Sequence, residues 1–495
     1  MFCHSTFKQL RFDEQLSELN AFVSDKPLEI MELLKNHFDL NKFIPNSFSN
    51  NYYSSLGRSK TLHLNSILAL LLLGHVFRIN SVKLLLLFLH LSPYVQEFCQ
   101  FDNGKLPDEP FISRFKTTFE NDINDLFENF SSHTMSICSE VDSLLPDDSD
   151  LKGFSSTLIY DTSGLKPKVK ENNPKTTQNI IKKYKNYAKI INNPDYNPYA
   201  AAYNSLPKYS SANPDIKLDF INGHYGYFYK FGLLSNALGL PLKLHFFDDK
   251  FYSLLPSDFK SFEDQKYSFD NASLKPVLLS FFPDGNSSFS TFIADSEFDS
   301  YDNFALLKHY KFKKVFIPLN VRNSKAHSDV VLSDSNGTPI CPIDGTEFIP
   351  QGACKGKNRS LRLKYICPKG FKIKGTNKFT HSCQNPCRQT KSVVTTYKYP
   401  DKDFRFYPGV QRNSDEWVKV YKKRTVIERE LAYLKSNSSL MSPNTLNTAS
   451  MRSDLLLAAS AKLIIVILAY AINKPNFIKN IKYCKTINNV LKFIA

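Results

Sequence analysis

Apolar positions recur every three or four residues along the first 150 residues of the chain. The clearest runs are PLEIMELLKNHF at 27–38, LNSILALLLLGHVF at 64–77, SVKLLLLFLHL at 81–91 and ISRFKTTFENDINDLFENF at 112–130. This spacing is typical of helices that bury one face and expose the other. We therefore expect residues 1–150 to form a compact helical domain, in which Asn80 or Ser81 caps the third of these helices.

Beyond residue 150 the pattern changes to short runs rich in β-formers. STLIYDTSGL at 156–165 predicts a strand that ends at Asp161, because the following Ser163 and Gly164 favour a turn. HYGYFYKFGLLSN and LPLKLHFF are expected to pair as a hairpin with its turn at 237–239, and a helical stretch follows. The segment 290–320 then predicts a strand, an acidic turn, an amphipathic helix and a strand.

Asp295 ends the first strand of that last segment, as Asp161 is expected to end the strand at 156–165. Ends of strands in α/β sheets are where metal and phosphate sites are built. The simpler interpretation of Asp161 is that its carboxylate bonds a turn amide. The sequence thus predicts an α/β fold with two candidate metal ligands at strand ends.

The segment YKKRTVIERELAYLK at 421–435 gathers one glutamate with side chains that bind phosphate. Tyr421, Arg424, Glu428 and Lys435 are separated by three, four and seven positions, which places them along one side of one helix. Such a face suits a nucleic-acid phosphate and a divalent metal ion, although a solvated charged helix would show the same spacing. Trp417 is expected to anchor this helix in the core, with base stacking as the alternative.

The charge of the chain favours a polyanionic partner. Its 495 residues predict two to four domains, and its formal net charge of +16 makes nucleic acid the leading candidate. Lys182, Lys183 and Lys185 lie in a Pro/Asn-rich, lysine-rich stretch at 166–209, which we interpret either as a DNA-facing arm or as a solvated loop. Arg114 and Lys116 add basic surface positions to the helical domain, which is either a domain that binds DNA ends or a dimerisation or packing domain.

Two apolar runs, at 64–91 and 455–472, are long enough to require a membrane check. The first run contains several polar residues, and the second contains Lys462 and only just reaches the length of a membrane span. Buried core helices explain both runs better, so no membrane contact is expected. A secretory signal pattern is also missing, which favours a cytoplasmic protein.

Five of the nine cysteines crowd into fewer than fifty positions. In a chain with no export signal, clustered cysteines are reduced thiols or metal ligands. Cys341, Cys367, Cys383 and Cys387 are the candidate ligands of one tetrahedral Zn²⁺, with Cys354 or His381 as substitutes. The alternative is a small basic domain with reduced thiols.

The Y-R-E-K spacing, with gaps of two, three and six residues, resembles the YREK signature of bacterial insertion-sequence transposases of the DDE class. The segment ADSEFDS resembles the second-aspartate motif of the same proteins, and YDTSGL precedes it in the right order. The resemblance covers most of 155–435. One departure is that the usual glycine and tyrosine after the second aspartate are Glu297 and Phe298 here.

This resemblance implies a ribonuclease H-like catalytic core with a mixed five-stranded sheet. The expected organisation is a helical DNA-binding or dimerisation domain at 1–150, core segments at 151–322 and 411–495, and a Cys-rich basic insertion at 323–410. Asp161, Asp295 and Glu428 would be the catalytic acids that hold two Mg²⁺ or Mn²⁺ ions. Tyr421, Arg424 and Lys435 would bind phosphates of the transposon end.

The implied function is a DNA transposase that binds the terminal inverted repeats of its insertion sequence, cleaves them and joins the 3′ ends to target DNA. Such a protein is expected to act as a homodimer on DNA and to associate with the bacterial nucleoid. Two alternatives are a metal-dependent nuclease of the same fold and a decayed or domesticated DNA-binding protein. The first would not be expected to carry the YREK set, and the second would be expected to lack at least one acid.

Overall fold

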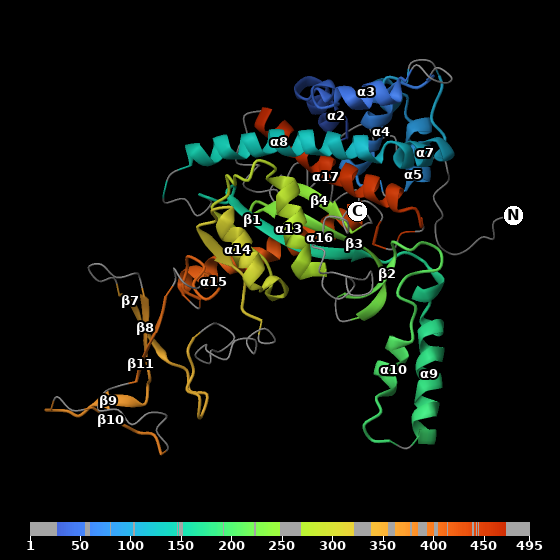
Figure 1. Cartoon of the computed structure of the whole chain (residues 1–495). Helices are drawn as coiled ribbons and strands as arrows, with labels where there is room; N and C mark the ends of the chain where they lie inside the picture. The colour runs from blue at the N-terminus through green and yellow to red at the C-terminus, as the bar shows by residue number, and fades with distance from the viewer. Residues whose placement is uncertain are drawn as a thin grey trace, which may run out of the picture.

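The computed structural model is a mixed α/β protein in which a helical N-terminal region packs against a mixed β-sheet (Figure 1). Two projections, one helical and one built of short strands, extend from this body (Figure 1). The structure describes residues 27–471 except 55–59, 80, 102–103, 146, 148–151, 192, 222–223, 248–268, 321–337, 355–361, 377–378, 385–393, 400–403, 413, 438–439, 442 and 444.

The N-terminal region is helical, as the apolar periodicity predicts. Its helices are α2 (Pro27–His37), α3 (Asn46–Tyr52), α4 (Leu64–Val76), α5 (Val82–Leu91), α6 (Pro93–Phe98), α7 (Glu109–Thr118) and α8 (Glu120–Leu144). Ser81 is the N-cap residue of α5, although its side chain makes no capping bond, and Asn80 lies outside the described residues. Asp108 caps α7 by accepting a hydrogen bond from the Phe111 N–H at 2.7 Å.

The main sheet contains six strands. They are β1 (Thr157–Leu165), β2 (Lys217–Ile221), β3 (His224–Asn236), β4 (Pro241–Phe246), β5 (Thr291–Ile293) and β6 (Lys314–Phe316). β3 pairs antiparallel with β1, β2 and β4, whereas β5 is parallel to both β1 and β6. The expected hairpin is therefore present as β3 and β4, and β2 is a strand that the sequence did not predict.

Alternate residues of β1 face two different hydrophobic cores. Leu158 and Tyr160 pack against α13 (Phe269–Phe281) and α14 (Tyr301–His309), whereas Ile159 faces the core formed with α8, α16 (Thr425–Asn437) and α17 (Thr448–Ala471). A strand that is buried on both faces reads as a continuous apolar run, as Leu158–Tyr160 does. The helices α13 and α14 thus cover one face of the sheet and α8, α16 and α17 the other (Figure 1).

Helix α17 is long and apolar enough to cross a membrane, the only such helix among the described residues. Most of it is buried inside the protein, where it packs against α8, α4 and α7. Its one lysine, Lys462, is paired with Glu430 of α16. In this fold the apolar run is accordingly a core helix, as its sequence indicates.

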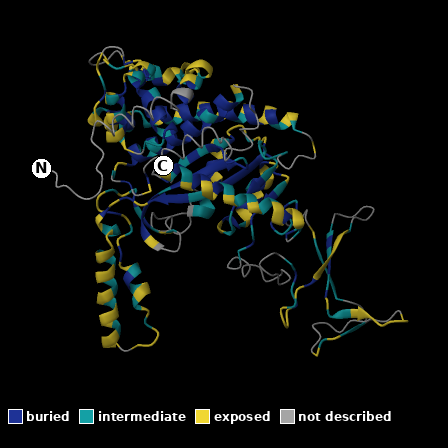
Figure 2. Ribbon diagram, turned by 180° about the vertical axis from the view of Figure 1, so that it is seen from behind, coloured by how far each residue is buried: buried dark blue, intermediate teal, exposed yellow. Residues whose placement is uncertain are grey.

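The lysine-rich stretch forms a helical hairpin rather than a loop. It comprises α9 (Pro174–Ile191) and α10 (Pro198–Asn204), which lie side by side and project from the body beside β2 (Figure 1). α9 has no buried residue, and the view coloured by burial shows the whole hairpin largely exposed (Figure 2). The alternation of basic with apolar and aromatic residues in α9 produces this amphipathic but uncovered helix.

The second projection carries the cysteine cluster. Its strands are β7 (Ile349–Cys354), β8 (Arg362–Ile366), β9 (Gly370–Lys372), β10 (Phe379–His381) and β11 (Thr395–Lys398), arranged as a three-stranded and a two-stranded sheet. A small core of Cys341, Phe348, Leu363, Tyr365 and Cys367 holds the three-stranded sheet together. The chain then rejoins the body at 404–412, where the Pro408 carbonyl accepts a hydrogen bond from the Val315 N–H of β6, and continues into α15 (Asp415–Tyr421).

Candidate active site

Asp161 lies in the middle of β1, not at its end as the sequence predicts. β1 continues to Leu165 because its pairing with β3 extends to Tyr229, while its pairing with β5 stops at Ile159. Gly164 does not form a turn. A Cβ atom at this position would lie 2.6 Å from the Ile221 side chain, so glycine permits a close approach between strands.

Asp295 lies in the turn that follows β5, close to the predicted position. It caps the 3₁₀ helix η3 (Ser296–Phe298), since its Oδ1 accepts a hydrogen bond from the Glu297 N–H at 2.9 Å. Asp161 is held in the same way, because its Oδ1 accepts a hydrogen bond from the Thr162 N–H at 2.8 Å. Asp161 on β1 and Asp295 just after the neighbouring strand β5 are therefore each fixed by a local backbone donor.

The YREK segment is not one continuous helix. α15 ends at Tyr421, a 3₁₀ turn η5 spans Lys422–Arg424, and α16 begins at Thr425. Trp417 anchors this segment as expected, since it is buried with its ring 5.1 Å from that of Phe316 and 6.2 Å from that of Tyr421.

Arg424 joins the first and the third of the predicted acids. Its Nη1 lies 3.2 Å from Asp161 Oδ2, and its Nη2 lies 2.5 Å from Glu428 Oε1. The guanidinium thus binds carboxylates here, where the sequence predicts a phosphate contact. Arg424 and Asp161 are 263 positions apart, so the fold brings distant segments to one place.

Electrostatic interactions connect Tyr421 and Lys435, the other two residues of the YREK set, with the candidate acids. Burial and then the charge of Asp295 raise the pKa of Asp161 to about 7, against the opposing effect of Arg424. Burial also raises the pKa of Asp295. Lys435 has its pKa lowered by burial, with Asp161 acting in the opposite direction. Burial raises the pKa of Tyr421. The charge of Arg424 lowers this pKa, and the charges of the three acids raise it.

Two crowded and partly buried carboxylates are the kind of site that a hard cation stabilises. Asp161 and Asp295 supply oxygen donors, and the Glu428 side chain is about half exposed beside them. In the part of the chain that the structure describes, no three Cys, His, Asp or Glu residues are gathered closely enough to hold a metal ion. Arg424 lies between Asp161 and Glu428, so it serves as their counter-ion in this conformation.

The lysines predicted to bind DNA are placed differently from the acids. Lys182, Lys183 and Lys185 are exposed on α9, in the projecting hairpin, and Lys185 lies over the Tyr199 ring at 4.6 Å from its centroid. Arg114 is exposed on α7 as expected, but Lys116 is not a surface residue. It is buried, and its Nζ lies 2.8 Å from Asp454 Oδ1. This ion pair links α7 to α17 in the core.

Two of the four candidate zinc ligands, Cys341 and Cys367, lie in one small core. Cys383 is partly exposed and, like Cys341, acts electrostatically on the nearby Lys369. Cys387 lies outside the described residues, as do the lysines and arginine at 355–359.

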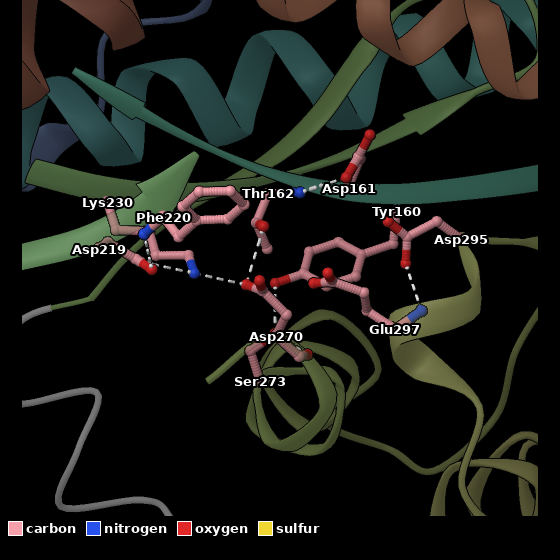
Figure 3. A network of polar contacts seen from close by, with 10 residues as sticks. All are labelled: Tyr160, Asp161, Thr162, Asp219, Phe220, Lys230, Asp270, Ser273, Asp295 and Glu297. Atoms are coloured by element: carbon pink, nitrogen blue, oxygen red, sulfur yellow. Dashed lines mark hydrogen bonds and ion pairs between the residues drawn. The ribbon is translucent and has the colours of Figure 1, made fainter. Parts of the chain in front are cut away.

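A polar network behind the aspartates was not predicted (Figure 3). Lys230 of β3 binds Asp219 at 3.0 Å and Asp270 at 2.8 Å, and Thr162 donates its hydroxyl to Asp270 at 2.8 Å. Burial and the charge of Asp270 raise the pKa of Glu297 to about 7. Asp270 belongs to a stretch with weak periodicity, so no pattern in the sequence marked it.

The N-terminal helices match a known family. Residues 17–118 match the family model described as Transposase domain (DUF772). This match supports a transposase-family protein. The matched residues include α2 to α7, so the transposase domain lies outside the segment of the acidic residues. No curated protein and no solved structure matches the chain at the significance required.

Proposed function

We propose that this transposase-family protein is a DDE transposase whose catalytic core has the ribonuclease H-like arrangement. The strand order supports this proposal. β4, β3, β1, β5 and β6 are adjacent in that order, with antiparallel pairs on one side of β1 and parallel pairs on the other. The acids lie on β1, after β5 and on a helix that follows β6.

The observation that carries the proposal is the double contact of Arg424. One guanidinium bridges Asp161 of β1 and Glu428 of α16, while Asp295 lies near enough to raise the pKa of Asp161. Asp161 and Glu428, from two separate segments, are thereby linked by one cation, and Asp295 of a third segment acts on the charge of Asp161. A solvated charged helix, the simpler interpretation of the YREK spacing, would not place its arginine against a strand carboxylate.

Asp161, Asp295 and Glu428 would hold Mg²⁺ or Mn²⁺, for which oxygen ligands are preferred. When bound, two such ions supply activation of the attacking water or 3′ hydroxyl and stabilisation of the leaving oxygen. Arg424 then exchanges its carboxylate contacts for a backbone phosphate, which a guanidinium binds through two parallel hydrogen bonds. Lys435 and Tyr421 bind adjacent phosphates and fix the scissile bond relative to the acids.

The exposed lysines of α9 extend this DNA contact along the projecting hairpin. Lys182, Lys183 and Lys185 present their charges on a helix without buried residues, which suits a duplex backbone. Tyr187, one of the interleaved tyrosines, contacts Tyr196 in the segment before α10, with ring centroids 5.9 Å apart.

The experiment is cleavage of a duplex that carries the flanking terminal repeats, with Mg²⁺ present. Asp161→Ala, Asp295→Ala and Glu428→Gln should each abolish cleavage and leave binding to the ends largely intact. Glu416→Gln is the matched control, because Glu416 is an exposed acid of α15 that pairs with Lys314. Full cleavage by any of the three variants would remove that residue from the site. Cleavage without joining to target DNA would favour the plain nuclease.

A structural zinc ion in the Cys-rich domain is the second part of the proposal. Cys341 and Cys367 share one core, and Cys341 and Cys383 both act on the charge of Lys369, so a four-thiolate site would need these three cysteines to draw closer and Cys387 to join them. Four protein ligands leave no open position, which makes the ion structural. Metal analysis of protein purified without chelator should give one equivalent of zinc. Less than half an equivalent, or unchanged folding after all four cysteines become serine, would exclude the site.

A further inference from the structure

A buried ion pair lies behind the two aspartates, on the face of the sheet covered by α13. Asp270, in the first turn of α13, binds Lys230 of β3 with Nζ and Oδ1 2.8 Å apart. Both side chains are largely removed from solvent, with exposed fractions of 22% and 12%. The proposed reaction makes no use of this pair, and burying two charges is costly unless their geometry is good.

Asp270 contacts the neighbours of both aspartates (Figure 3). Thr162 donates its hydroxyl to Asp270 Oδ1 at 2.8 Å, and the Thr162 N–H donates to Asp161 at 2.8 Å. On the other side, the Glu297 carboxyl is hydrogen-bonded to Asp270, and the Glu297 N–H donates to Asp295 at 2.9 Å. Each aspartate therefore accepts a hydrogen bond from the backbone of a residue whose side chain is held by Asp270.

We propose that Asp270, held by Lys230, is a positioning residue that sets the separation of Asp161 and Asp295 for metal binding. The two strands concerned pair directly only at 157–159 and 291–293, short of either aspartate. Beyond that point one buried carboxylate links the two segments through Thr162 and Glu297. The proposal depends on the proposed function, in which Asp161 and Asp295 hold the metal.

Lys230 has a different part in this arrangement. Asp270 alone would place a third negative charge behind two crowded carboxylates, which would oppose their ionisation. The Lys230 ammonium lies within 3.0 Å of both Asp270 and Asp219, so it offsets that charge. Glu297, the departure from the usual second-aspartate motif, is accommodated because it shares a hydrogen bond with Asp270 instead of facing the site as a free charge.

The test is a titration of metal against variants that keep the shape of the network. Thr162→Val removes only the hydroxyl, Thr162→Ser retains it, and Asp270→Asn removes the charge. Binding of Mn²⁺ to the full-length protein without DNA, followed by the electron paramagnetic resonance signal of free Mn²⁺, is the first readout. The Mg²⁺ concentration for half-maximal cleavage of terminal-repeat DNA is the second.

Asp270→Asn and Thr162→Val should each weaken Mn²⁺ binding and raise the half-maximal Mg²⁺ concentration by about 10- to 100-fold, the usual effect of an outer-shell change. Thr162→Ser should restore wild-type values. Asp219→Asn is the matched control, since Asp219 binds the same Lys230 but accepts its other hydrogen bond from the Phe220 N–H, away from Thr162 and Glu297. DNA-end binding should be unchanged throughout.

Folded Asp270→Asn and Thr162→Val proteins with wild-type metal dependence would overturn the positioning role. If Asp270→Asn fails to fold, the comparison of Thr162→Val with Thr162→Ser decides, because it alters a single hydroxyl. Failure of the proposed function gives a different result. In that case the wild-type protein neither binds Mn²⁺ nor cleaves, or Asp161→Asn retains both properties.

Discussion

Lys462 of α17 forms a buried ion pair with Glu430 of α16, two residues beyond Glu428. Two positions along a helix differ by about 200° in direction, so Glu430 points into the core while Glu428 faces the acids. Lys462 also donates to the carbonyl of Gly239, in the turn between β3 and β4, at 2.6 Å. One lysine thus fixes the helix that carries the third acid to both α17 and the sheet.

Replacing Lys462 with Met should strongly destabilise the protein. Glu430 would remain buried without its counter-ion, which costs about 3–5 kcal/mol in the free energy of unfolding. The double variant Lys462→Met, Glu430→Leu should regain most of this loss, because an apolar pair of similar volume needs no counter-ion. Urea unfolding measures both effects. Equal stability of the single variant and the wild type would show that the ion pair is exposed to water in solution.

The stability of the metal-free protein should fall as the pH rises from about 4 to about 7. Asp161 has a folded-state pKa of about 7, raised by burial and by Asp295, so the folded state holds a proton that the unfolded chain has already lost. Glu297, with a pKa raised to about 7, acts in the same direction.

Asp161→Asn should therefore stabilise the metal-free protein more at pH 8 than at pH 5. Thermal unfolding at the two pH values measures the difference. Glu297→Gln separates the second contribution, since it leaves Asp161 in place. A stabilisation that is the same at both pH values would mean that Asp161 is ionised across the whole range.

Arg424→Ala should weaken binding to the DNA ends and abolish cleavage. One lost phosphate contact lowers the slope of log affinity against log salt by about one. Arg424→Lys should also impair cleavage, because an ammonium cannot reproduce the two-pronged contact of a guanidinium. Lys422→Ala, the same loss of charge at an exposed neighbour, should keep cleavage. An unchanged salt slope and unchanged cleavage in Arg424→Ala would make the YREK spacing a coincidence.

Arg405 should be required for stability although it lies in the return from the Cys-rich domain. Its Nε and Nη2 bind the two oxygens of Asp299 at 2.7 and 2.6 Å, and Asp299 is fully buried four residues after Asp295. Arg405→Ala leaves that carboxylate unpaired, which costs about 3–5 kcal/mol. Arg405→Lys should recover part of the loss. Urea unfolding tests both, and a neutral Arg405→Ala variant would contradict the buried pair.

Periodicity predicted the elements whose pattern is strong. The helices at 27–144, the β3–β4 hairpin and the strand-turn-helix-strand at 290–320 are present, because their apolar faces match the period of the element. Asp161 was misplaced because Ser163 and Gly164 look like a turn, whereas pairing with β3 draws them into the strand. At these two residues the pairing with β3 outweighs their local preference for a turn.

The sequence named residues for the candidate site but could not indicate the contacts that they make. Spacing placed Arg424 and Glu428 one turn apart, and the structure agrees. It could not indicate that Arg424 would bind the carboxylates themselves, or that Lys116 would be buried against Asp454, because both depend on segments hundreds of positions away. The sequence did not predict the pair of Asp270 and Lys230 for the same reason, because neither residue stands out within its own segment.

The bridge from Arg424 to Asp161 has a consequence for synthesis of the protein. Its two ends are 263 positions apart, and α16 is held in place by α17, which itself packs on the early helices α8 and α4. A ribosome that has translated only as far as α15 has made Asp161 and Asp295 but neither Glu428 nor the helix that secures it. Under the proposed function, a truncated or half-made chain would not cleave DNA, and DNA near the translating ribosome would stay uncut until the last core helix has folded.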